Sequence, residues 1–144
     1  MKQNIIISAC LLGEPCRYDG ASKSAPLAYR LREKSNLIPV CPEVFGGLPT
    51  PRVPSEIVGD RVINQVGVDV TRQYQRGAEV ALSMAREGKV AFAVLKARSP
   101  SCGKGKTYDG TFTGTLIDQH GVTVTAFLDA GILVYTEDEI EELI

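Results

Sequence analysis

The sequence of 144 residues is poor in several residue types, and each shortage excludes a class of protein. It has no tryptophan and a single histidine, His120, so zinc sites built on histidine and cysteine–histidine–aspartate triads are not expected. It also has no excess of charge, because 16 basic and 17 acidic residues give a formal net charge of -1. Non-specific nucleic-acid binding needs a clustered positive field, so a nucleic-acid partner is not expected.

Long apolar runs are missing as well. The run at residues 5–7 is too short for the core of a signal peptide, and no stretch approaches the roughly 20 apolar residues of a membrane span. We therefore expect a cytoplasmic protein with no membrane contact. In a reducing cytoplasm, cysteines are more often metal ligands or nucleophiles than disulfide partners. The first candidates for function are therefore the four cysteines, Cys10, Cys16, Cys41 and Cys102.

The predicted elements alternate between strand and helix. Apolar runs predict strands at residues 5–7, 37–40, 90–95 and 132–134. Apolar residues at helical spacing predict helices that begin at Ser24–Pro26, at Asp69, at residue 122 and at Thr136, which forms a capping box with Glu139. This alternation predicts one α/β domain over residues 1–144, a small doubly wound, Rossmann-like parallel sheet with helices on both faces.

Two long loops and one insertion complete the expected fold. The dipeptide Gly59–Asp60 between two short apolar runs predicts a β-hairpin insertion. Residues 41–55 and 99–114 are rich in glycine, proline and serine, and we expect both to be loops. Ordered loops of this length usually carry function.

Three of the cysteines follow predicted strands. Cys10 comes after the first strand, Cys41 directly after the second, and Cys102 a short loop after the third. The carboxyl ends of parallel strands meet at one edge of the sheet, where open α/β folds bind their ligands. We therefore expect these three thiols to converge there. The alternative is that they are small buried side chains of the core.

The spacing of the thiols limits their chemistry. There is no Cys-x2-Cys pair, which structural zinc sites and thioredoxin-like redox sites usually contain. A cysteine nucleophile would need His120 as its base, and His120 precedes Gly121 in a predicted surface turn. Three converging thiolates without histidine suit an iron–sulfur cluster and leave one iron open to a substrate. A zinc-stabilised domain remains an alternative.

Several ordered motifs together resemble the 2-thiouracil desulfidase family, formerly domain of unknown function 523. They are SACLLG at residues 8–13, RYDG at 17–20, CPE at 41–43, GGL at 46–48, TPR at 50–52, SPSCG at 99–103 and YDG at 108–110. The resemblance extends over essentially the whole chain. It implies a non-redox desulfuration of a small thiolated pyrimidine at a [4Fe-4S] cluster that is held by three cysteines.

Carried over residue by residue, the resemblance implies Cys10, Cys41 and Cys102 as cluster ligands. It also implies Glu43 and Ser101 as catalytic residues. Cys16 is left over, because it lies in the RYDG loop rather than directly after a strand. We expect Cys16 to lie near the site without binding the cluster.

The expected chemistry is the hydrolysis of a carbon–sulfur bond. A soft thiocarbonyl sulfur suits the open iron, which as a Lewis acid polarises that bond. Glu43 is expected to activate water as a general base, and Ser101 to relay a proton or orient the ring. The alternatives are that the Glu43 carboxylate only stabilises the start of a helix, and that the Ser101 hydroxyl only makes a local backbone hydrogen bond in a turn. For the whole protein, the alternative is a cluster-binding sulfur carrier without its own turnover.

Four further residues are predicted to contact the substrate. Arg17 and Arg52 are loop cations suited to a polar or anionic group, and Tyr18 to stacking on a pyrimidine ring. Gly103 belongs to a glycine-rich loop whose backbone donors suit a bound ligand. The alternatives are that the two arginines brace loops by pairing with acidic side chains, and that Tyr18 only packs within its loop.

Overall fold

The structure is a computed structural model that describes residues 2–21 and 26–144. Its centre is a four-stranded parallel sheet in the order β2-β1-β5-β8. The strands are β1 (Gln3–Ser8), β2 (Ser35–Val40), β5 (Phe92–Leu95) and β8 (Val134–Thr136). The three isoleucines of β1 are fully buried, as a central strand covered on both faces requires.

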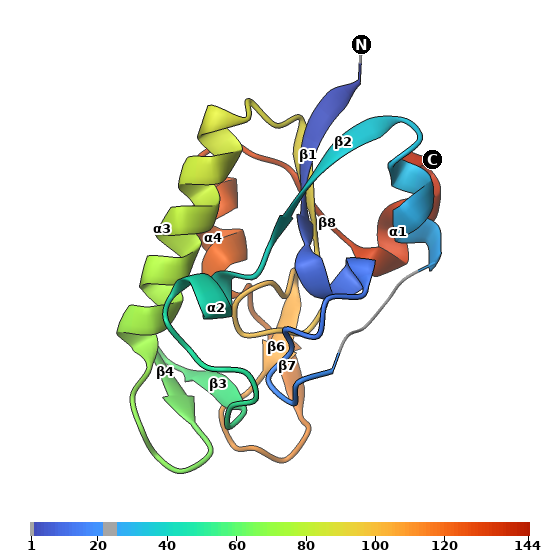
Figure 1. Ribbon diagram of the computed structural model, residues 1–144. Helices are drawn as coiled ribbons and strands as arrows, with labels where there is room; N and C mark the ends of the chain where they lie inside the picture. Colours follow the sequence, from blue (N-terminus) through green and yellow to red (C-terminus); the bar gives the residue numbers. More distant parts are fainter. Residues whose placement is uncertain (1, 22–25) are drawn as a thin grey trace.

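Helices cover both faces of this sheet (Figure 1). Ile6 packs with α3 (Thr71–Glu87) and α4 (Val122–Asp129) on one face. Its neighbours Ile5 and Ile7 pack with α1 (Pro26–Leu31) and the 3-10 helix η2 (Glu137–Leu143) on the other. The doubly wound α/β prediction is therefore confirmed. No helix among the described residues is both long enough and apolar enough to cross a membrane.

Two antiparallel pairs lie beyond the carboxyl edge of the sheet (Figure 1). The pair of β3 (Ser55–Val58) and β4 (Arg61–Asn64) confirms the hairpin predicted at Gly59–Asp60. A second pair, β6 (Lys106–Tyr108) and β7 (Leu116–Asp118), starts inside a segment that the sequence predicts as loop. The other predicted loop contains the four-residue helix α2 (Pro42–Phe45), and a 3-10 helix, η1 (Ala9–Leu12), follows β1.

The helix ends differ from the prediction in detail. Helix α3 begins at Thr71, and Asp69 caps it from outside by accepting a hydrogen bond from the Thr71 amide at 2.9 Å. The capping box of Thr136 and Glu139 is present, but the helix that it starts is of the 3-10 type. Ser24, the residue predicted to cap the first helix, lies outside the described residues.

The order of the strands places the site. The chain passes from β1 to β2 on one side and then crosses to β5 on the other, so the topological switch point lies between β1 and β5. Ligands of doubly wound sheets bind at this point, outside the carboxyl ends of the strands. The segments that leave β1, β2 and β5 there are η1, α2 and the loop from Lys96 to Gly105.

Candidate functional site

A cavity of about 530 Å³ opens at the switch point. Its walls come from the segments that follow β1, β2 and β5, with contributions from α3 and from the loops beside both hairpins. Both polar and apolar side chains line it, as is usual for a small-molecule site. Its position is the one that the predicted topology assigns to a ligand.

All four cysteines line this cavity as free thiols. Cys10 lies in η1, Cys41 is the residue before α2, and Cys102 lies in the loop after β5. Cys16 joins them from the loop after η1, and the Cys41 thiol donates a hydrogen bond to its carbonyl oxygen at 3.6 Å. The structure thus brings together the three cysteines predicted to converge, and it adds Cys16 to them.

The surroundings of Cys16, Cys41 and Cys102 raise the pKa of each thiol. Burial raises the pKa of Cys102 to about 12. A hydrogen bond with the Cys10 thiol is the main factor that raises the pKa of Cys16 to about 11. The pKa of Cys41 is raised by its hydrogen bond with Cys16 and by burial. Thiols bind a metal centre as thiolates, and the positive charge of the metal lowers their pKa when it binds.

The thiols reach the cavity from separate segments of the chain. Among the described residues, no three cysteine, histidine or acidic side chains come close enough to hold one metal ion. Thiolates that hold a cluster bind different iron atoms, so they do not need to meet at one point. The residues present therefore fit an iron–sulfur cluster.

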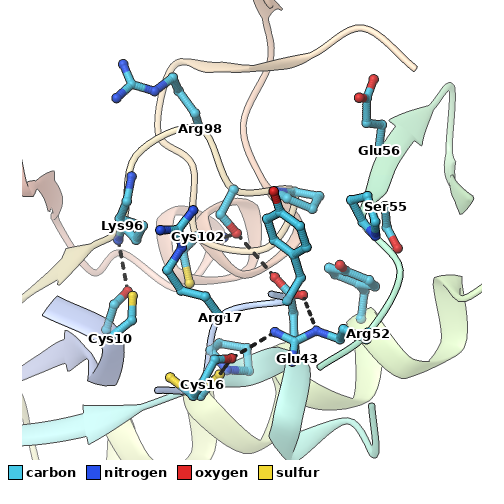
Figure 2. A pocket seen from close by; sticks show the side chains of 18 of the residues that line it. Cys10, Cys16, Arg17, Glu43, Arg52, Ser55, Glu56, Lys96, Arg98 and Cys102 are labelled. Atoms are coloured by element: carbon cyan, nitrogen blue, oxygen red, sulfur yellow. Dashed lines mark hydrogen bonds and ion pairs between the residues drawn. The ribbon is translucent and has the colours of Figure 1, made fainter. Parts of the chain in front are cut away.

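Glu43 lies beside the cysteines and is firmly oriented (Figure 2). One carboxylate oxygen accepts a hydrogen bond from the Arg52 Nε at 2.9 Å, and the side chains of Arg52 and Glu43 are 6% and 15% exposed. The second carboxylate oxygen accepts a hydrogen bond from the Ser99 hydroxyl at 3.5 Å. The structure therefore places the predicted general base in the cavity with a fixed orientation.

Of the two serines beside Pro100, the structure brings Ser99 to the cavity and not Ser101. Ser99 lines the cavity, and its oxygen accepts hydrogen bonds from the amides of Ser101 and Cys102, both at 3.0 Å. These amides occupy its lone pairs, so its own proton is directed to Glu43. Ser99 thus links the carboxylate to the loop of Cys102.

Ser101 lies in the protein interior, away from the cavity. It is fully buried, it does not line the cavity, and its Oγ shares a hydrogen bond of 2.7 Å with the hydroxyl of Thr123 in α4. The structure therefore does not bring the Ser101 hydroxyl, which the resemblance implies to be catalytic, to the cavity, because that hydroxyl is hydrogen-bonded to Thr123. The only sequence signal for Ser99 is its position three residues before Cys102, where a serine oxygen can cap a turn.

Arg52 lines the cavity, but its guanidinium is occupied. Besides Glu43, its nitrogen atoms donate to the carbonyl oxygens of Pro49 and Cys16 and to the Thr50 hydroxyl, at 3.0 to 3.1 Å. These contacts connect α2 with the loop that follows it and with the loop that contains Cys16. These contacts suit the alternative interpretation of Arg52, in which it braces loops, better than the predicted role in substrate binding.

Arg17 and Tyr18 lie on the rim of the cavity, where the sequence places substrate contacts. The Arg17 guanidinium lies 5.9 Å from the centre of the Tyr18 ring, and Tyr18 is 41% exposed. Gly103, in contrast, does not line the cavity. A Cβ atom there would lie 2.6 Å from the carbonyl oxygen of Ser99, so this glycine serves the packing of the loop.

Lys96, Glu56 and Tyr74 are among the polar side chains of the cavity that were not predicted from the sequence. Lys96 pairs with Glu137 at 3.0 Å. Glu56 is buried in β3, and its carboxylate accepts hydrogen bonds from two backbone amides of the loop at residues 109–115. Tyr74 of α3 is 1% exposed. A buried acid within a strand and a phenol on an apolar helix face give no signal in the sequence pattern.

Comparisons with known proteins agree with this site. The 2-thiouracil desulfurase family model matches residues 5–139. The uncharacterized protein YbbK of Bacillus subtilis (strain 168) is 36% identical over 150 residues, which cover 97% of this chain and 99% of that protein. A solved structure of the [4Fe-4S]-dependent thiouracil desulfidase TudS superposes with a TM-score of 0.93 at 45% identity, covering 99% of this chain and 95% of that one. The chain therefore belongs to the 2-thiouracil desulfurase family.

Proposed function

We propose that this protein is a [4Fe-4S]-dependent desulfidase that hydrolyses the carbon–sulfur bond of a 2-thiouracil-like pyrimidine. The observation that carries the proposal is the cavity itself, in which three cysteines suited to a cluster lie beside the oriented carboxylate of Glu43. The similarity to TudS supports the same assignment. Water supplies the oxygen of the product, sulfur leaves as hydrosulfide, and no electrons are exchanged overall.

In the proposed reaction, Cys10, Cys41 and Cys102 hold the cluster. When bound, the cluster supplies a Lewis acid with affinity for the soft thiocarbonyl sulfur. Glu43 takes a proton from the attacking water. Ser99, in place of Ser101, holds the Glu43 carboxylate in position through its hydroxyl proton. Each of these groups lies in or beside the cavity before a substrate arrives.

The remaining residues bind the substrate and keep the site in order. Arg17 and Tyr18 contact the pyrimidine from the rim, where Tyr18 offers an exposed ring face. Arg52 keeps the Glu43 carboxylate facing the cavity. We place the reaction in the cytoplasm, because a reducing compartment keeps such thiols free. The net charge of -1 gives no reason to add a nucleic-acid partner.

Anaerobic purification tests the proposal directly. The expected protein is brown, contains about four iron and four sulfide per chain, and releases sulfide from 2-thiouracil with formation of uracil. A stable cluster with no release of sulfide would overturn the enzyme assignment and favour a sulfur carrier. A colourless protein that binds zinc and unfolds on chelation would overturn the cluster as well.

The assignment of Ser99 leads to a matched pair of variants. Ser99→Ala is expected to lower kcat by about 100-fold, because misplacement of a reacting group has effects of this size. Ser101→Ala is expected to lower stability by about 1–3 kcal/mol through the unpaired Thr123 hydroxyl and to keep kcat within a few-fold. Ser99→Thr should restore most of the turnover. Steady-state kinetics on variants with equal iron content check this prediction, and a larger kcat loss in Ser101→Ala would contradict it.

A further inference from the structure

A glutamate at one side of the cavity holds the loop between β6 and β7 in place. Glu56, which is 9% exposed in β3, accepts hydrogen bonds on one carboxylate oxygen from the amides of Gly110 and Phe112, at 2.9 and 3.1 Å. Figure 2 shows Glu56 on the side of the cavity away from Cys10. Hydrogen bonds to a charged acceptor are stronger than those to a neutral one. The loop at residues 109–115 therefore has a fixed position on that side of the cavity.

The same loop lies against β3 at a second point. A Cβ atom at Gly110 would lie 2.9 Å from the carbonyl oxygen of Ile57, the residue that follows Glu56. Only glycine permits so close an approach of two backbones. The loop is therefore held on β3 both by a carboxylate and by direct packing of the main chain.

Phe112 is the aromatic residue of this loop, and it borders the cavity. Its φ of 57° lies in the left-handed region, which a bulky side chain rarely adopts. The hydrogen bond from its amide to Glu56 holds it in this conformation. Strained backbone of this kind is concentrated at active sites and at contacts with ligands. The strain therefore indicates a functional position for the Phe112 side chain.

The ring of Phe112 is not used by the core. The side chain is half-buried, and it belongs to none of the three apolar clusters of the described residues. Within the part of the chain that the structure describes, neither a second aromatic ring nor a cation stacks on it. Phe92 is also half-buried, but it packs on the apolar cluster under α1 and forms an edge-to-face pair with Tyr135. The Phe112 ring, in contrast, is available for a ligand in the cavity.

We propose that Phe112 recognises the substrate by packing its ring on the pyrimidine, and that Glu56 is a positioning residue that holds Phe112 there. Aromatic side chains stack on the flat faces of nucleobases and exclude water from them. The inference rests on the proposed function, because it takes a thiolated pyrimidine as the occupant of the cavity. Phe112 takes no part in the proton transfer, so its contribution is to binding alone.

Phe112→Leu tests the inference, because it removes the ring and keeps an apolar side chain. On the cluster-loaded protein, KM for 2-thiouracil should rise by about 5-fold, at the lower end of the range for loss of base stacking. The kcat should stay within a factor of three, and the visible absorption of the cluster should be unchanged. Phe112→Tyr keeps a ring and should restore most of the affinity. The matched control is Phe92→Leu, which should lower the melting temperature and leave KM unchanged.

Glu56 is tested through the same readout. Glu56→Ala releases the two amides and should raise KM about as much as Phe112→Leu. Glu56→Gln keeps an oxygen that accepts from them and should return KM toward the value of the unmodified protein. In the double variant of Glu56→Ala and Phe112→Leu the effects should not add, because one residue acts through the other. Additive effects, or an unchanged KM in Glu56→Ala, would overturn the positioning role.

Equilibrium binding separates this inference from the proposed function. Calorimetry with 2-thiouracil, in a Glu43→Gln background that turns over slowly, should show about 5-fold weaker binding when Phe112→Leu is added. If the unmodified protein binds 2-thiouracil but releases no sulfide, the proposed function fails, whereas the same comparison still tests the ring. Equal affinity with and without the Phe112 ring, or no binding of 2-thiouracil by either protein, would overturn the inference.

Discussion

Replacing Cys102 by alanine is expected to give a colourless protein that releases no sulfide from 2-thiouracil. Cys102 is the thiol that the loop after β5 contributes, whereas the other cysteines come from the segments after β1 and β2. Without it, one side of the cavity offers no sulfur to the cluster. The side chain is only 6% exposed, so no external thiol replaces it readily. Iron and sulfide content after anaerobic reconstitution, together with the visible spectrum, measure the outcome.

The matched control is Cys16→Ala. Cys16 packs in the same apolar cluster as Cys10, and its carbonyl oxygen accepts a hydrogen bond from the Cys41 thiol. It therefore lies on the side of the cavity that Cys10 and Cys41 already supply. We expect this variant to keep its iron and most of its turnover. A Cys16→Ala protein without iron, beside a Cys102→Ala protein with a full cluster, would reverse the assignment of the third ligand.

The central sheet was predictable because its signals are local and strong. Residues 5–7 are apolar on both faces, which predicts a strand covered from both sides, and all three are fully buried. The hairpin at Gly59–Asp60 likewise follows from turn chemistry alone. The convergence of Cys10, Cys41 and Cys102 then follows from topology, because each comes after a parallel strand.

The elements that the sequence does not predict depend on distant contacts. Helix α2 has four residues, too few to form alone, and it is held on α3 by the contact of Gly46 and Gly77. Strands β6 and β7 have three residues each, and those of β7 are all exposed. Such short segments show no alternation of apolar and polar residues.

The choice between the two serines illustrates the same limit within the site. Ser99 and Ser101 flank one proline, and the local sequence does not show which of the two hydroxyls faces the cavity. Their partners are distant, since Ser99 reaches Glu43 across 56 positions and Ser101 reaches Thr123 across 22. Only the packing of α2 and α4 on either side of the loop decides which hydroxyl faces the cavity.

Replacing Glu43 by glutamine is expected to lower kcat by about 10³-fold, within the range that general base catalysis contributes. The amide has the size of the carboxylate and still accepts the hydrogen bond from Arg52, but it takes no proton from water. Iron content and the visible spectrum should therefore match those of the unmodified protein. Sulfide release under saturating 2-thiouracil measures kcat, and KM should change little.

The control for this change is a carboxylate with a similar ion pair outside the cavity. Glu139 pairs with Lys104 at 3.1 Å and does not line the cavity, so Glu139→Gln should leave kcat unchanged. The comparison separates the loss of a proton acceptor from the general effect of removing one negative charge. If Glu43→Gln also turns over at the unmodified rate, the carboxylate serves only to balance the buried charge of Arg52. The proton acceptor would then be another group in the cavity wall, and Glu56, whose carboxylate is also buried there, would be the next carboxylate to replace.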